Sequence, residues 1–96
     1  MSNNLETTHH LLIDGEFSTE EAQTILMTLI GDKIRFHQQE NLSHEERFGS
    51  SSERSRFRID QLLQTRSDLT AVINEAKASG ERLAINCNIE ITRLSP

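Results

Sequence analysis

The sequence predicts an α+β fold in the order β-α-α-β, and two stretches near its ends indicate this order. An apolar run at residues 11–13 is followed at Ser18 by the sequence Ser-Thr-Glu-Glu, which is typical of a helix N-terminus. Large apolar residues then recur at every second position after Gly80: Leu83, Ile85, Cys87, Ile89 and Ile91. This alternation is typical of a half-buried strand. We therefore expect a long antiparallel helical hairpin packed on a small antiparallel sheet.

The first strand is expected over residues 9–14, with a turn at Asp14 and Gly15. Residues 1–8 are polar and are predicted to form a disordered tail, which leaves residues 9–96 as a single α+β domain. Ser18 is expected to cap the first helix, because its hydroxyl can accept a hydrogen bond from the backbone N–H of Glu21. The carboxylate of Glu21 can in turn reach the backbone of Ser18, which completes a capping box.

The first helix is predicted from Thr19 to about Asn41, with apolar residues over about half of its circumference. A second capping signature at Ser43 predicts a break near Leu42 and a further helical turn that ends at Phe48. Residues 49–52, Gly-Ser-Ser-Ser, are expected to form a loop. The second helix should run over residues 53–79 and end at Gly80, and the last strand should cover residues 82–93.

The predicted elements leave a thin core, since only 34% of the 96 residues are apolar and no Trp or Tyr is present. Two strands are narrower than two packed helices, and they expose two sheet edges. We expect a homodimer or higher oligomer that completes the sheet through a strand edge. A four-helix bundle formed by two hairpins is the other possible arrangement.

The net charge of −5 argues against nucleic-acid binding, but the charge is unevenly distributed. Residues 33–66 carry seven basic and five acidic residues and have a net charge of +2, whereas the rest of the chain has −7. No signal peptide and no membrane-spanning stretch is recognisable. A single cysteine, Cys87, fits a reducing compartment, so the cytoplasm is the expected location and no membrane association is expected.

Polar residues interrupt the apolar stripes of both predicted helices near the hairpin tip. Lys33, His37 and Glu40 share the stripe of the first helix, while Arg66 falls in that of the second and Arg58 lies at its border. One interpretation is structural: Glu40 pairs with Arg58, and the long basic side chains extend to solvent. The other interpretation is a binding site for a small anion, formed by Lys33, His37, Arg58 and Arg66.

The predicted tip also carries aromatic residues next to arginines. Arg47 precedes Phe48, and Arg54 lies three residues before Phe57. Exposed phenylalanine and arginine are enriched at protein interfaces, so these four residues are candidates for partner binding. The alternative is that the two phenylalanines pack against each other and close the hairpin.

No catalytic constellation is present, and His9, His10, His44 and Cys87 have no metal-site spacing. The sequence therefore predicts a non-enzymatic, self-associating binding protein without cofactor or metal, a regulator or inhibitor that docks onto a partner protein. The alternative is a binder of an anionic metabolite or nucleotide in the polar part of the hairpin.

Overall fold

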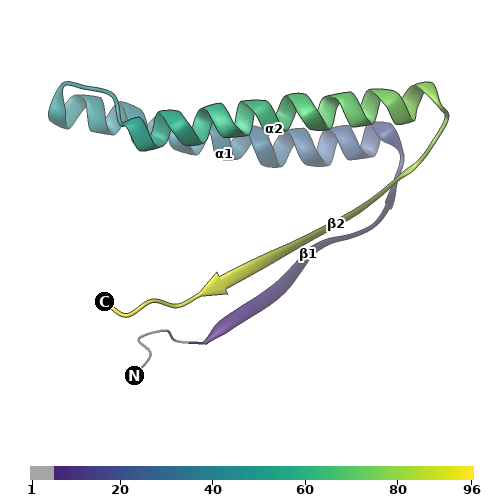
Figure 1. The fold of residues 1–96 in the computed structure, drawn as a ribbon, viewed down its shortest axis with the longest axis horizontal. Coiled ribbons are helices and arrows are strands. Elements are labelled where there is room, and N and C mark those ends of the chain that lie inside the picture. Colours follow the sequence, from purple (N-terminus) through teal and green to yellow (C-terminus); the bar gives the residue numbers. More distant parts are fainter. Residues whose placement is uncertain (1–5) are drawn as a thin grey trace.

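The computed structural model describes residues 6–96 and confirms the predicted β-α-α-β order. Strand β1 (Thr7–Phe17) leads into helix α1 (Thr19–Phe48), which is followed by helix α2 (Glu53–Ala78) and strand β2 (Leu83–Thr92). The helices form a long antiparallel hairpin, and the strands pair as a two-stranded antiparallel sheet (Figure 1). No helix in the described part of the chain is long and apolar enough to cross a membrane.

Strand β1 is longer than the sequence predicted at both ends. Thr7 and Thr8, which the sequence pattern places in the tail, pair with Thr92 and Ile91. The prediction for residues 1–5 lies outside the described residues. The expected turn at residues 14 and 15 is wrong, because Gly15 pairs with Ile85 and the strand continues to Phe17. The long partner strand supplies backbone hydrogen bonds along this whole segment, so the Asp-Gly pair remains extended.

A β-bulge at Leu12 changes which side chains of β1 share a face. The ladder pairs Leu11 with Asn88 and then Ile13 with Cys87, so Leu12 has no partner in it. After the bulge, odd-numbered residues of β1 lie beside the apolar side chains of β2, and before it even-numbered residues do so. The bulge therefore brings Ile13 and Phe17 of β1 onto the face that carries the apolar side chains of β2.

Helix α1 is continuous, and the predicted break near Leu42 is wrong. Its N-terminus has the expected capping box, in which Ser18 and Glu21 exchange hydrogen bonds of 2.9 and 3.1 Å. The signature at Ser43 lies inside the helix, since extending a formed helix costs less than ending it and nucleating another. The helix ends at Gly49, which adopts a left-handed conformation with φ of 73° and donates a backbone hydrogen bond to Glu45.

The buried part of the molecule lies mainly between the two helices. Among the described residues, the buried apolar side chains are Ala22, Ile30, Ile34, Ile73 and Ala76. The sheet extends away from the hairpin, so the chain has two arms joined at the end where strands meet helices (Figure 1). Its extents are 49 × 40 × 16 Å and its radius of gyration is 17.3 Å. A compact domain of this length has a radius of gyration of about 12.5 Å, so the chain is markedly extended.

Candidate functional site

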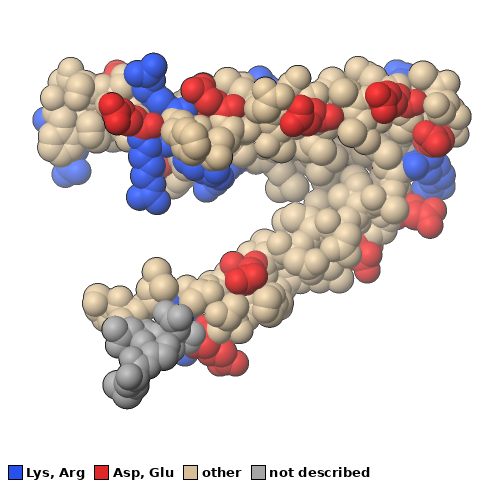
Figure 2. All heavy atoms as spheres, in the orientation of Figure 1, with Lys and Arg blue, Asp and Glu red and all other residues tan. Residues whose placement is uncertain are grey.

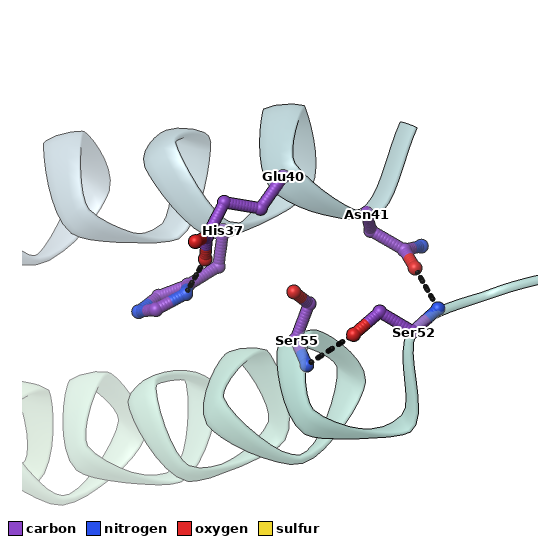
Figure 3. Close-up of polar contacts among 5 residues, drawn as sticks. All are labelled: His37, Glu40, Asn41, Ser52 and Ser55. Carbon is purple, nitrogen blue, oxygen red and sulfur yellow. Dashed lines mark hydrogen bonds and ion pairs between the residues drawn. The ribbon is translucent and has the colours of Figure 1, made fainter. Parts of the chain in front are cut away.

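The polar interruption of the helical hairpin centres on His37, which is buried between α1 and α2. Only 8% of this residue is exposed. Its Nδ1 atom lies 2.8 Å from Oε1 of Glu40, one helical turn further along α1 (Figure 3). Because a carboxylate can only accept, Nδ1 of His37 carries the proton and donates this hydrogen bond.

The other ring nitrogen of His37 has no hydrogen-bond partner among the described residues. This Nε2 atom is buried, and in Figure 3 it points along the space between the helices, away from Glu40. A buried polar atom without a partner destabilises a protein by about 1–3 kcal/mol. Nε2 can accept a hydrogen bond when the ring is neutral and can donate one when the ring is protonated.

His37 forms part of the wall of a groove of about 490 Å³ between the two helices. Lys33 and Glu40 line it from α1, and Arg54 and Arg58 line it from α2. Three of the four residues proposed from the sequence as an anion site, Lys33, His37 and Arg58, therefore lie around one groove. Arg66 does not line this groove, and its side chain is exposed although it falls in the predicted apolar stripe. The long arginine side chain extends to solvent from that position.

The basic side chains of the groove form no ion pair with the acidic side chains that the structure describes. Among the described residues, no carboxylate oxygen lies within 4.0 Å of a side-chain nitrogen of Lys33, Arg54 or Arg58. The predicted pair of Glu40 with Arg58 is not formed. Arg58 donates a hydrogen bond to Gln61, and Glu40 accepts one from His37. Figure 2 shows Lys and Arg gathered over the tip half of the hairpin. With one acidic residue among its lining side chains, the groove carries a net charge of +2 when His37 and His44 are neutral.

The N-terminus of α2 forms another part of the groove wall. Ser52 caps this helix by accepting a hydrogen bond of 3.3 Å from the backbone N–H of Ser55. Ser55 is buried, and its hydroxyl group points toward α1 in Figure 3. The positive end of the helix dipole thus adds to the basic side chains. Helical periodicity contains no signal that Ser52 and Arg54 line this groove.

The tip of the hairpin exposes both of its aromatic side chains. Phe48 is 68% exposed and Phe57 is 60% exposed, so neither is buried in the closure of the hairpin. The ring of Phe48 contacts that of His44, with centroids 4.7 Å apart. All four predicted partner-binding residues, Arg47, Phe48, Arg54 and Phe57, have exposed side chains.

The apolar face of the sheet is covered only near the helices. Ile85 and Cys87 are partly buried there, whereas Ile89 and Ile91 toward the outer end are exposed. Leu11 and Leu12 on β1 are exposed as well. The outer half of the sheet consequently presents large apolar side chains to solvent.

The described residues contain no group of three His, Cys, Asp or Glu side chains that could hold a metal ion. Comparison of the chain with protein-family models, with curated proteins and with solved structures found no match.

Proposed function

We propose that this chain is a non-enzymatic binding protein that self-associates and docks onto a partner protein through the tip of its helical hairpin. The observation that carries the proposal is the amount of surface that a single copy exposes. The chain has an accessible surface of 7506 Å². A compact monomer of 11.0 kDa exposes about 5,600 Å², so this chain exposes about 1,900 Å² more.

An excess of this size matches the area that a stable dimer buries. Obligate homodimers bury about 1,000–2,500 Å² on each partner, and their interfaces are rich in apolar residues. The outer half of the sheet supplies such residues, with Ile91 50% exposed and Leu12 51% exposed. A two-stranded sheet is also marginally stable alone and has two unpaired edges. A second copy of this chain would cover both features.

The charge distribution also favours a second copy of this chain as the binding partner of the sheet. Neither strand contains Lys or Arg, and the two strands together carry Asp14, Glu16 and Glu90. The tip half of the hairpin carries most of the basic residues. In a second copy that runs antiparallel to the first, the acidic strands of one chain and the basic tip of the other would attract each other.

The tip has the composition of a docking surface. Phe48 and Phe57 are exposed large apolar side chains, and Arg47 and Arg54 are exposed nearby along the chain. Aromatic residues and arginine are enriched where proteins contact each other. We propose that these residues contact the partner, and that Cys87 reflects a reducing compartment such as the cytoplasm.

Light scattering during size-exclusion chromatography tests self-association. The full chain should elute with about twice the mass of 11.0 kDa, or more, at micromolar concentration. Ile89→Asp should reduce the mass toward that of a monomer, because Ile89 lies on the apolar face of β2. Asn88→Asp is the matched control, since Asn88 is adjacent but lies on the opposite face.

A monomer mass for the unmodified chain at high micromolar concentration would contradict the proposal without any variant. Equal effects of the two substitutions would also contradict it, because the interface would then not involve the apolar face. Circular dichroism of each variant reports whether the helices are retained.

A further inference from the structure

We propose that the groove between α1 and α2 binds a small phosphorylated molecule, whose phosphoryl group is held by Lys33, Arg54 and Arg58. The proposal concerns a single chain and does not depend on self-association. It rests on the basic side chains, on the N-terminus of α2 and on the buried ring of His37, which all meet at this groove.

The charge of the groove is unusual for this protein. Three cations and one carboxylate, that of Glu40, line it, and among the described residues no carboxylate oxygen lies within 4.0 Å of a cationic nitrogen of these three side chains, in a chain whose net charge is −5. Like charges held close together repel each other, and a bound dianion would remove this repulsion. The planar guanidinium groups of Arg54 and Arg58 match the geometry of phosphoryl oxygens, which they can bind in pairs.

The N-terminus of α2 adds donors of the kind that phosphate requires. The backbone N–H of Ser52 is used by Asn41, and that of Ser55 is used by Ser52. Glu53 and Arg54 occupy the first turn, where backbone N–H groups have no acceptor within the helix. A helix N-terminus binds phosphate through such groups and through its dipole.

His37 provides the second, independent indication of a ligand. His37 lines the groove and is 8% exposed. Its Nε2 atom has no hydrogen-bond partner among the described residues. Glu40 fixes the ring by accepting from Nδ1. Nε2 can therefore accept from a hydroxyl group of the ligand, or donate to a phosphoryl oxygen when the ring is protonated. Because Nε2 is buried, this contact requires movement of the atoms that cover it.

The size of the groove argues for more than an inorganic ion. Its volume of about 490 Å³ falls within the range of small-molecule sites, about 300–1,000 Å³. Phe36 also lines it, and Nζ of Lys33 lies 4.8 Å from the centroid of that ring. An organic group attached to the phosphate could contact this apolar ring.

Thermal unfolding of the full chain at constant ionic strength tests the proposal. The probes are inorganic phosphate, adenosine monophosphate and glucose 6-phosphate, with chloride as the reference and citrate as a carboxylate. A phosphorylated probe should raise the melting temperature in a saturable way, and citrate should do so less. The absence of any shift, or an equal shift with citrate, would overturn the proposal.

Two arginine variants separate a local site from general attraction of anions. Arg58→Gln should weaken the apparent affinity about tenfold or more, because it removes a charge-assisted contact. Arg66→Gln removes the same charge two helical turns away and should change the affinity by about twofold or less. Equal losses in the two variants would overturn the proposal. Light scattering of each variant reports self-association separately, so loss of ligand binding with the dimer mass retained leaves the proposed self-association standing.

Nuclear magnetic resonance of the histidine rings gives a readout that ordinary stabilisation would not produce. Phosphate should shift the ring signals of His37, whereas those of His9 on the sheet should change little. Shifts of equal size at both residues would contradict binding in the groove.

Discussion

Asn41 and Ser52 lie eleven residues apart and join α1, two turns before its end, to the N-terminus of α2. The Oδ1 atom of Asn41 accepts a hydrogen bond of 2.6 Å from the backbone N–H of Ser52 (Figure 3). Ser52 is also the N-cap of α2, so this contact positions the first turn of that helix against α1. The groove wall formed by Ser52, Arg54 and Ser55 depends on this position.

Asn41→Ala should lower the free energy of unfolding by about 1 kcal/mol, because the partly buried N–H of Ser52 loses its acceptor. Urea denaturation measures this change, and hydrogen exchange at Ser52 should become faster. Asn74→Ala is the control, since Asn74 is exposed near the C-terminus of α2, far from the tip. A loss as large in the control would mean that the contact between Asn41 and Ser52 contributes nothing specific.

The capping box of α1 should make stability depend on pH in the acidic range. The backbone N–H of Ser18, followed by its side chain, lowers the pKa of Glu21, and the charge of Arg82 adds to this effect against a small opposing contribution from burial. A lowered pKa in the folded state means that the charged carboxylate contributes stability above the pKa of the unfolded chain. This contribution is lost as the pH falls through the lower pKa of the folded state.

The melting temperature, measured at a series of pH values from about 6 down to about 2, reports this loss of stability. Glu21→Gln should remove the part of the pH dependence that comes from the capping box, because the amide does not titrate. Glu20→Gln, in the adjacent position of the same helical turn, should retain that dependence. Identical profiles for the unmodified chain and Glu21→Gln would contradict the assignment.

Phe57→Ala should change the free energy of unfolding by less than about 0.5 kcal/mol, because Phe57 is exposed. Ile73→Ala should lower it by about 2–5 kcal/mol, because Ile73 is 4% exposed between the helices. Guanidinium denaturation of the two variants compares these values. A large loss for Phe57→Ala would show that this ring closes the hairpin and would weaken its proposed role in docking.

The ends of the helices could be predicted because their signals lie within a few residues. Ser18 and Glu21 form the capping box that their spacing indicates, and Gly80, with φ of 67°, follows α2 as expected. The alternation from Leu83 to Ile91 likewise identified β2 and its apolar face. In each case the interacting groups are neighbours in the chain, so the pattern of residues contains the whole interaction.

Strand β1 differs from its prediction because its environment comes from a distant part of the chain. Strand β1 continues through Gly15 because β2 pairs with it, and the bulge at Leu12 exists only relative to that partner. Ser43 differs, because its pattern of a cap is overridden within α1 itself: extending the formed helix to Gly49 costs less than nucleating a new one. A local pattern indicates which backbone conformations a segment can adopt. Hydrogen bonds to a remote segment determine which of these conformations is stable in the folded chain.

The same distinction applies to the groove. Composition and helical periodicity were enough to identify Lys33, His37 and Arg58 as polar residues at or next to the apolar stripes through which the two helices face each other. The pairing of His37 with Glu40, the exposure of Arg66 and the presence of Ser52 and Arg54 in the groove wall depend on how α1 and α2 are aligned. That alignment follows from packing between helices and from the contact of Asn41 with Ser52, because side-chain reach across a hairpin is set by three-dimensional distance and not by spacing along the chain.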